Sequence, residues 1–300
     1  MRLRADVAIL GVAFIWGISF VIVKRALSDI SVLLYLSVRF TLAAAVMAFI
    51  YRRQIAAGFS RQQWIAGLAT GALLMGGYIL QTAGLVYTTP AKSAFLTGLY
   101  IVLVPIFSSL VLKSTPGLFE VLGVAAAVLG MYLMSVNAGV FRITLGDSLT
   151  IACAVVYAFH IMTLGYFAPR TGYVSISLLQ VSTAALVAWI AYGTWALSTN
   201  VRAIERWTPP VLTAIVVGGL LCTAVAFTVQ SWAQQFTTAT RAALLMSLEL
   251  VFAWLASYVF EGEVLSMRSG AGAILIMAGI LLVELKPSAM IGHPSNEAQP

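Results

Sequence analysis

The chain has 300 residues, of which 61% are hydrophobic and only 9% are charged. Soluble domains carry about 25% charged residues, so this composition excludes an ordinary soluble protein and indicates a membrane protein. The net charge of +7 does not indicate nucleic-acid binding, because no polar stretch interleaves Lys and Arg with aromatic residues. Cys153 and Cys222 lie inside apolar segments, and we interpret both as packing residues.

Ten apolar segments follow one another along the chain. Each has about the 20 residues that a helix needs to cross a bilayer, and the connections between them are short. We therefore expect an all-α membrane protein with ten transmembrane helices and no soluble domain. Arg2 and Arg4 precede the first segment, but no clean signal-peptide cleavage site follows it. The predicted spans are 7–23, 31–51, 64–86, 92–112, 118–136, 148–168, 174–197, 210–232, 241–260 and 269–285.

The second half of the chain repeats the first. Residues 78–134 match 227–283 without a gap at an offset of 149, and an earlier stretch repeats at an offset of 141. A single insertion between the two stretches reconciles the offsets. Internally duplicated membrane proteins tend to place a binding site where their halves meet. Matching positions include Asp6 with Asp147, Arg39 with Gln180, Lys92 with Arg241, Gly123 with Gly272, and Gly130 with Gly279.

Five helices in each half imply a particular topology. Because five is an odd number, the second half would enter the membrane from the opposite side, so we expect an inverted five-plus-five repeat. Its predicted parts are a first half at 1–138, a second half at 139–286 and a disordered polar tail at 287–300. Both termini are predicted to be cytoplasmic, because the early basic residues favour that side. These are Arg2, Arg4, Arg52 and Arg53.

Four predicted helices share one polar pattern, in which a hydrogen-bonding group follows an aromatic ring by three residues. Residues three apart lie on one helix face, and polar groups inside a membrane face the bundle interior or a wet cavity. We therefore expect the four faces to converge on one polar, aromatic-lined cavity. The alternative is hydrogen bonding between helices without a ligand. The pairs are Trp16 with Ser19, Tyr78 with Gln81, Tyr157 with His160, and Phe227 with Gln230.

Three ionisable residues lie well inside predicted spans. Glu249, near the middle of span 241–260, is a counter-ion for an ammonium group, a proton-coupling site or a neutral acid that fixes helix packing. For Arg39 we favour a structural tie to backbone carbonyls over binding a substrate carboxylate or pairing with Glu249. His160 is either a pH-sensitive gate or a packing residue.

Further charged residues are predicted at helix ends. Lys24, Lys92 and Arg241 would extend their long side chains to the lipid headgroups. Because Lys92 and Arg241 occupy matching repeat positions, we also expect them to flank the two mouths of the cavity. Glu261 and Glu263 are expected to be solvated.

Enzyme signatures are missing from the sequence. It has no zinc-binding helix, nucleophile elbow or Walker loop, and His160 and His293 are too few for a histidine metal site. We therefore expect no catalytic residues, no metal and no cofactor. An intramembrane lipid-modifying enzyme and an accessory membrane subunit without transport activity are the alternatives to a transporter.

Three stretches resemble the EamA-type transporters of the drug/metabolite transporter superfamily: WGISFVIVKRAL, QTAGLVYTTPAKSAFLTGLYIVLVP and FTTATRAALLMSLELVFAWLASYVFEGE. The resemblance covers roughly residues 6–285. It implies a ten-helix inverted fold and alternating access through a central cavity, with small metabolites, often amino acids, as substrates that are often moved outward. The sequence departs from the family at one point, where Leu250 replaces the proline that often follows the glutamate matched by Glu249. Pro105 remains available to kink the fourth helix.

Together, the residues and the resemblance predict an inner-membrane secondary transporter that exports small metabolites, with amino acids or related amines first. The expected partners are a small-molecule substrate and the lipid bilayer, with protons as a candidate coupling ion and no nucleic acid. The protein would act as a monomer or a homodimer. Nine residues are predicted to contact the substrate: Trp16, Ser19, Tyr78, Gln81, Tyr157, His160, Phe227, Gln230 and Glu249.

Overall fold

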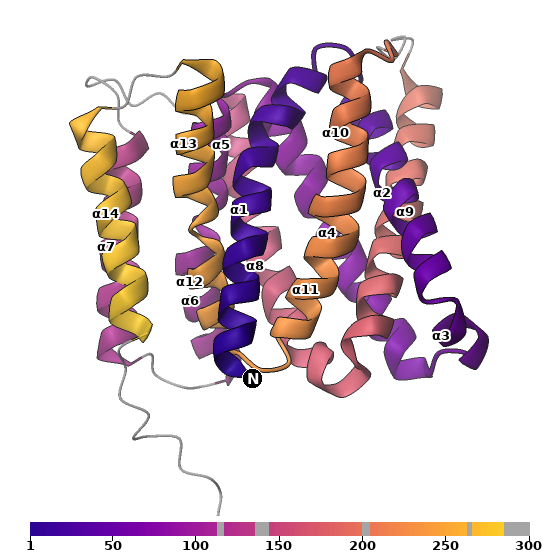
Figure 1. The fold of residues 1–300 in the computed structure, drawn as a ribbon, viewed down its shortest axis with the longest axis horizontal. Coiled ribbons are helices and arrows are strands. Elements are labelled where there is room, and N and C mark those ends of the chain that lie inside the picture. Colours follow the sequence, from indigo (N-terminus) through magenta and orange to yellow (C-terminus); the bar gives the residue numbers. More distant parts are fainter. Residues whose placement is uncertain (113–116, 136–143, 200–204, 263–265, 285–300) are drawn as a thin grey trace, which may run out of the picture.

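The chain folds into a bundle of helices, shown in Figure 1. The computed structural model describes residues 1–112, 117–135, 144–199, 205–262 and 266–284. Within these ranges, eight helical segments are long and apolar enough to cross a membrane, and α7 and α14 contain shorter apolar stretches. The protein is therefore an all-α, multi-pass membrane protein. The predicted boundary at 138–139 and the tail at 287–300 lie outside the described residues, as do Glu263 and His293.

The helices follow the order of the predicted spans. The first half of the chain contains α1 (Arg2–Ala26), α2 (Val32–Ile50), α3 (Arg52–Ala57), α4 (Arg61–Val86), α5 (Pro90–Thr97), α6 (Tyr100–Leu112) and α7 (Leu118–Ser135). The second half contains α8 (Leu145–Thr171), α9 (Tyr173–Ser198), α10 (Pro209–Gly219), the π-helix η1 (Leu220–Val225), α11 (Ala226–Ala233), α12 (Ala239–Met246), α13 (Glu249–Glu261) and α14 (Met267–Glu284).

Short polar side chains fix several helix starts. The Ser60 hydroxyl accepts a hydrogen bond from the backbone N–H of Gln63 at the start of α4, and Thr144 does the same for Asp147 in α8. In both cases the third side chain of the helix bonds back to the cap, which completes a capping box. Two threonines at matching repeat positions, Thr89 and Thr238, cap α5 and α12.

The predicted fourth and ninth spans are each interrupted by a two-residue turn. Gly98–Leu99 separates α5 from α6, and Ser247–Leu248 separates α12 from α13 at the matching repeat position. In both turns the backbone bonds tighten to the i→i−3 pattern. Leu99 N–H donates to the carbonyl of Leu96, and Leu248 N–H donates to that of Leu245, each at 3.3 Å.

These turns correct the prediction for the ninth span. Glu249 does not lie within one continuous helix over 241–260, because it is the first residue of α13, directly after the turn. Neither turn contains a proline, and Pro105 lies inside α6 rather than at the break. The interruption therefore does not depend on the proline that the sequence lacks after Glu249.

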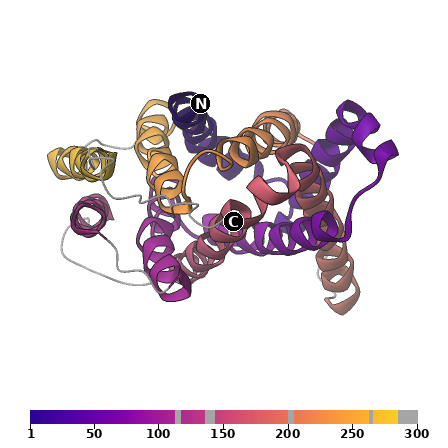
Figure 2. The same ribbon diagram turned by 90° about the horizontal axis from the view of Figure 1, so that it is seen from below.

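Glycine contacts between α7 and α14 relate the two halves to each other. These helices pack as a pair at one edge of the bundle (Figures 1 and 2). A Cβ added to Gly130 would lie 2.4 Å from the Gly272 carbonyl oxygen, and one added to Gly279 would lie 2.5 Å from that of Gly123. The offset of 149 exchanges these two contacts, so each half makes the same contact to the other.

Candidate functional site

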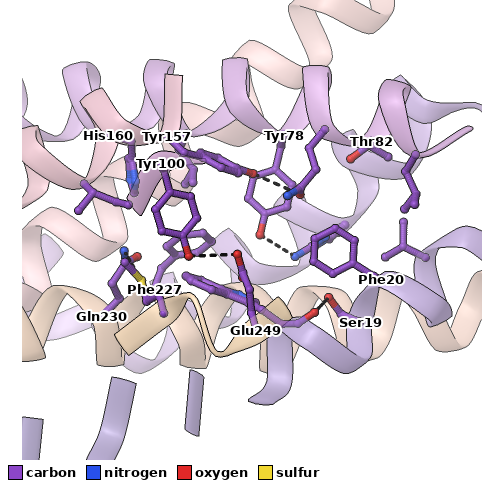
Figure 3. Close-up of a pocket in the computed structure, with 18 residues that line it drawn as sticks. Ser19, Phe20, Tyr78, Thr82, Tyr100, Tyr157, His160, Phe227, Gln230 and Glu249 are labelled. Atoms are coloured by element: carbon purple, nitrogen blue, oxygen red, sulfur yellow. Dashed lines mark hydrogen bonds between the residues drawn. The ribbon is translucent and has the colours of Figure 1, made fainter. Parts of the chain in front are cut away.

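A cavity lies inside the bundle (Figure 3). Its walls come from α1, α2, α4 and α6 of the first half and from α8, α11, α12 and α13 of the second. All nine residues predicted to contact the substrate line this cavity. Their role in binding stays a prediction. Nine further residues complete the wall: Phe20, Val23, Arg39, Leu74, Thr82, Leu85, Tyr100, Ile161 and Met246.

Four aromatic rings from the two halves form much of this wall. The ring centroids of Trp16 and Phe227 are 5.3 Å apart, and those of Tyr78 and Tyr157 are 5.9 Å apart. Trp16 matches Tyr157 at the offset of 141, and Tyr78 matches Phe227 at the offset of 149, so each of these contacts is the repeat counterpart of the other. Tyr78 and Phe227 occupy matching positions and meet each other edge to face at 6.1 Å. The rings offer apolar and π contacts to a ligand.

Two glutamines at matching positions add polar groups to the wall. Gln81 donates from Nε2 to the Thr97 hydroxyl at 3.2 Å, and its Oε1 accepts from the Tyr157 hydroxyl at 3.4 Å. Gln230 is less well satisfied, because its Nε2 reaches only the sulfur of Met246 at 3.4 Å. The Gln230 Oε1 is buried and has no hydrogen-bond partner among the described residues. Since unpaired buried acceptors are costly, this oxygen suits a donor inside the cavity.

Glu249 supplies the cavity with a carboxyl group. The Tyr100 hydroxyl donates to its Oε1 at 3.1 Å, and these two residues occupy matching repeat positions. The Glu249 side chain makes no ion pair with any residue that the structure describes. Figure 3 shows its carboxyl group beside the Tyr100 ring. The halves therefore differ chemically at this point, where one supplies an acid and the other a phenol.

Arg39 is not tied to backbone carbonyls, so that prediction was wrong. Its Nε donates to the Thr223 hydroxyl at 3.0 Å, and its terminal nitrogens donate to the hydroxyls of Tyr78 at 3.1 Å and Tyr35 at 3.4 Å. The Thr223 hydroxyl itself donates to the carbonyl of Gly218, five residues earlier, at 2.7 Å. The π-helical stretch η1 permits this bond and leaves the Thr223 oxygen to accept from the guanidinium.

His160 belongs to a buried polar chain between helices. Its Nε2 lies 3.0 Å from Oε1 of Gln180, whose Nε2 donates to the hydroxyl of Ser231 at 3.1 Å. The His160 ring also meets Phe227 edge to face at 6.1 Å. Gln180 matches Arg39 by the repeat, so the same position carries a neutral amide in one half and a cation in the other.

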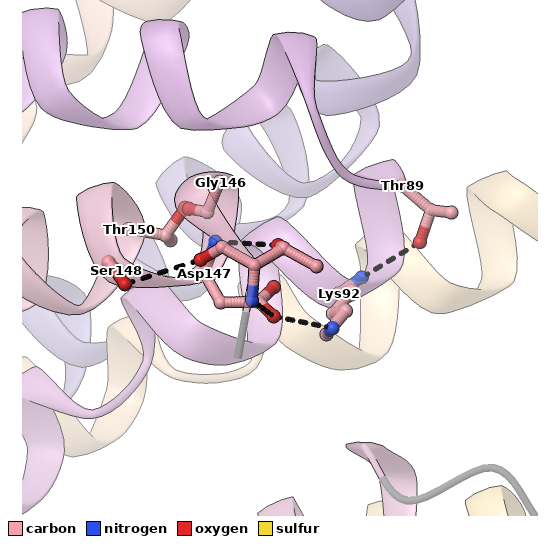
Figure 4. Close-up of polar contacts among 7 residues, drawn as sticks. Thr89, Lys92, Gly146, Asp147, Ser148 and Thr150 are labelled. Carbon is pink, nitrogen blue, oxygen red and sulfur yellow. Dashed lines mark hydrogen bonds and ion pairs between the residues drawn. The ribbon is translucent and has the colours of Figure 1, made fainter. Parts of the chain in front are cut away.

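Ion pairs join the two halves at both ends of the cavity-forming helices. Lys92 Nζ of α5 lies 2.8 Å from Asp147 Oδ2 of α8 (Figure 4), and Arg241 of α12 lies 2.9 Å from Asp6 of α1. Asp6 matches Asp147 and Lys92 matches Arg241 in the repeat, so each ion pair is the repeat counterpart of the other. The expectation that Lys92 and Arg241 extend to the headgroups was wrong, because a carboxylate at the facing helix start holds each one.

These two ion pairs lie at opposite ends of α1. Asp6 is close to the first residue of α1, whereas Lys24 near its other end donates to the carbonyls of Leu85 and Val86 at the end of α4. Helix α5 and its Lys92 begin directly after α4. The 18 residues from Asp6 to Lys24 correspond to about 27 Å of helix, close to the thickness of a bilayer core.

Two other charged residues also differ from their predicted surroundings. Lys24 caps the carboxyl end of α4 instead of extending to headgroups, because the last carbonyls of a helix lack partners within it. Glu261 is not simply solvated, since its Oε1 accepts from Arg25 Nε at 2.8 Å. Both side chains of this pair remain substantially exposed.

No metal site is visible in the part of the chain that the structure describes. It contains no group of three or more His, Cys, Asp and Glu residues placed to hold an ion. Cys153 and Cys222 are buried and free, in agreement with their predicted role in packing. The polar groups of the cavity are suited to binding and orienting a small molecule.

Some residues in the cavity wall or bonded to it were missed in the sequence although a signal for them existed. Tyr100 occupies the repeat position that matches Glu249, so the repeat could have identified the tyrosine that donates to this acid. Thr97 and Met246, which bond the two glutamines, likewise match each other. Leu74 precedes Tyr78 by one helical turn and could have been added to its face.

Comparisons with known proteins agree with this arrangement. The model of the EamA-like transporter family matches residues 3–136 and again residues 144–285. An uncharacterized transporter of Archaeoglobus fulgidus is 31% identical over 286 residues, which cover 95% of this chain and 87% of that protein. A solved structure, described only as the crystal structure of a protein, has a TM-score of 0.75 at 18% identity, and the similarity covers 95% of this chain and 98% of that one.

The family matched twice along the chain is one of transporters and not of enzymes. Both matches together cover nearly all of the sequence. The chain belongs to the EamA-like transporter family of the drug/metabolite transporter superfamily.

Proposed function

We propose that the protein is an inner-membrane secondary transporter that exports small metabolites, with amino acids or related amines first, by alternating access around the central cavity. One observation carries this proposal. A polar, aromatic-lined cavity lies inside an apolar bundle, and both halves of the chain supply its walls. Side chains such as Gln230 and Glu249 are costly inside a membrane, and a bound polar substrate would use them.

The proposed architecture is an inverted repeat of five plus five membrane crossings. It counts α7 and α14 as crossings beside the eight longer segments, with halves at 1–138 and 139–286. Support comes from pairs of contacts in which each contact is the repeat counterpart of the other. Such reciprocal contacts are expected when a pseudo-twofold axis relates the two halves. Tyr100 and Glu249 match by the repeat and touch each other, as residues beside such an axis would. Both termini would then lie on the same, cytoplasmic, side.

The paired interactions at the two ends suggest how access alternates. Lys92–Asp147 would hold the halves together at one end of the cavity, and Arg241–Asp6 would do so at the other. Opening toward one side of the membrane requires that only the pair at that side separates. The interrupted helices α5–α6 and α12–α13 start at these pairs and reach the cavity through Tyr100 and Glu249, so they connect each end to the site.

Mutation of the two matching glutamines tests the proposed function. In proteoliposomes, Gln81→Ala and Gln230→Ala should each lower substrate flux while the protein stays folded and monodisperse. Thr228→Ala is a suitable control, because within the described ranges its hydroxyl bonds only to the backbone of its own helix stretch. Normal flux in both glutamine variants would remove the cavity from the transport pathway.

The role of Glu249 is tested by the pH profile of transport. As a proton-coupling site or a counter-ion, the carboxyl group would give a pH dependence that Glu249→Gln abolishes or shifts. Identical pH profiles and rates in the parent and the variant would make the acid a structural group. The substrate would first be identified by comparing metabolite pools in cells and medium when the chain is over-expressed.

A further inference from the structure

Arg39 is a charged side chain in the cavity wall, and no carboxylate among the described residues pairs with it. The residue is 3% exposed, and every hydrogen-bond acceptor it has among the described residues is a neutral hydroxyl. Its guanidinium carbon also lies 4.7 Å from the Tyr78 ring centroid, a cation–π contact. A guanidinium stays protonated in proteins, so this position keeps a positive charge inside the bundle.

The hydroxyls around Arg39 position the guanidinium without using all of its donors. The group has five N–H bonds, and hydrogen bonds to Thr223, Tyr78 and Tyr35 use one on each nitrogen. One N–H on each terminal nitrogen therefore has no acceptor in the described part of the chain. Two such donors are the pair that a carboxylate accepts in a bidentate contact.

The same cavity contains a separate acidic group. Glu249 is 4% exposed, it accepts from the Tyr100 hydroxyl, and no ion pair joins it to Arg39. An isolated charge is costly in a medium of low dielectric, and a ligand that carries the opposite charge recovers part of this cost. A cavity in which a cation and a separate carboxyl group do not meet suits a molecule with a carboxylate and an ammonium group, since a bound ammonium group favours the ionised form of the carboxyl group.

A third group calls for a hydrogen-bond donor on the ligand, independently of these charges. The Gln230 Oε1 is buried, lines the cavity and accepts no hydrogen bond from any described residue. Such an oxygen is satisfied by an N–H or O–H donor. An ammonium group has three donors, enough to bond to this amide and to a carboxylate at once.

The second half shows that a charge is not required to connect helices at this position. Gln180 matches Arg39 and joins His160 to Ser231 through a neutral amide. A glutamine therefore suffices for a buried interhelical connection. The positive charge in the first half needs another explanation, and a ligand anion supplies one.

We propose that Arg39 is a specificity-determining residue that binds a substrate carboxylate, and that the cavity selects dipolar substrates with a carboxylate at Arg39 and an ammonium group at Glu249 and Gln230. This inference rests on the proposed transport function and makes it narrower, because it separates amino acids from the related amines. The aromatic rings of Trp16 and Phe227 would contact the remainder of the substrate.

A competition experiment in proteoliposomes tests this selection. The vesicles are offered a mixture of the proteinogenic amino acids, the amines that lack their carboxylate and the acids that lack their amino group, and transported compounds are identified by mass spectrometry. We expect at least one amino acid to move at least about tenfold faster than the amine and the acid with the same side chain. A tenfold preference corresponds to about 1.4 kcal/mol, close to the lower limit for one charge-assisted hydrogen bond.

Substitutions of Arg39 and Glu249 test which side chain is responsible for which part of this preference. Arg39→Gln, which copies the second half, should lower amino-acid flux at least about tenfold without lowering amine flux. Arg39→Lys keeps the cation but lacks the planar fork, so its loss should be smaller and again confined to compounds with a carboxylate. Glu249→Gln should instead lower the flux of compounds with an ammonium group. If Arg39→Gln is not folded in detergent, the Arg39→Lys result decides.

Two outcomes would overturn the proposal while leaving transport intact. One is a parent protein that moves an amine or an acid at least as fast as every amino acid. The other is an equal loss of amino-acid and amine flux in the Arg39 variants, which would make the residue purely structural. By contrast, a parent protein that moves no compound, in this mixture or in the wider metabolite screen, would refute the proposed function itself.

Discussion

The two ion pairs give the most specific prediction for alternating access. Asp147→Asn removes the charge that holds Lys92, and its amide oxygen can still accept the Thr144 backbone N–H bond that caps α8. Asp6→Asn does the same to the pair with Arg241 at the opposite end. If each pair closes its own end, the two substitutions must favour opposite conformations.

The size of the effect follows from the exposure of the partners. The Asp147 side chain is 5% exposed and that of Lys92 is 36% exposed, so this bond is neither fully buried nor an ordinary surface pair. Hydrogen bonds to charged groups contribute about 1.5–3 kcal/mol when buried and exposed pairs about 0–1 kcal/mol. A value of about 1–2 kcal/mol lies between them and corresponds to about a 5- to 30-fold change in the ratio of the two open states.

Accessibility of one cysteine measures this ratio. Ser19→Cys in the cavity wall, on a background where Cys153 and Cys222 are replaced by alanine, is labelled with an impermeant reagent from either side of oriented vesicles. Asp147→Asn should raise labelling from the side opposite the N-terminus, and Asp6→Asn should raise it from the N-terminal side.

The control for these variants is an ion pair outside the proposed gates. Glu261→Gln disrupts the pair with Arg25, whose side chains are 33% and 51% exposed, and should leave the labelling ratio nearly unchanged. Shifts in the same direction for Asp147→Asn and Asp6→Asn, or no shift in either, would refute the assignment of the two pairs to opposite ends.

Two stability predictions follow from close packing and buried bonds. Gly130→Ala should lower the free energy of unfolding by about 1–3 kcal/mol, because its Cβ would overlap a backbone carbonyl of α14. A Cβ at Gly11 meets nothing within 4 Å, so Gly11→Ala should not destabilise the protein. Thermal unfolding in detergent compares the two variants, and equal unfolding temperatures would contradict the packing of α7 on α14. Thr223→Val should cost about 1–3 kcal/mol, because it removes an acceptor of Arg39, while Thr228→Val, which loses only a bond within its own helix stretch, should cost less. A smaller loss for Thr223→Val than for Thr228→Val would refute that role.

The cavity residues could be predicted because the duplication makes the pattern visible four times. A ring followed by a polar group on one helix has many explanations, but Tyr78–Gln81 and Phe227–Gln230 repeat at matching positions. Membrane insertion then adds a strong constraint, since amides do not face lipid. Periodicity and the repeat together placed eight residues around one space, and the presence of an ionisable group inside a span added Glu249.

Features that depend on contacts between distant helices could not be predicted in this way. The repeat shows that Asp6 and Asp147 occupy equivalent positions, and that Lys92 and Arg241 do too. No local rule states which of these acids pairs with which of these bases. The turn before Glu249 was missed because it contains no proline. Its backbone bonds follow the i→i−3 pattern, but its residues do not differ from those of an ordinary helix.

The surroundings of Arg39 illustrate the same limit. Its main acceptor, Thr223, is presented by a π-helical stretch, and no pattern of apolar residues over 210–232 distinguishes that stretch from an α-helix. A contact to backbone carbonyls was the natural expectation for a lone buried arginine. Carbonyls inside regular helices are already bonded, however, so hydroxyl side chains take their place.

The central claim is that this chain alone carries a small polar metabolite through the cavity between its halves. The direct measurement is counterflow in proteoliposomes that contain only the purified protein, preloaded with the compound found in the metabolite screen. We expect labelled compound to accumulate with the parent chain, and accumulation to fall to the level of empty vesicles when Gln81 and Gln230 are both replaced by alanine. Equal accumulation with the double variant, or none with a folded parent chain, would contradict the account.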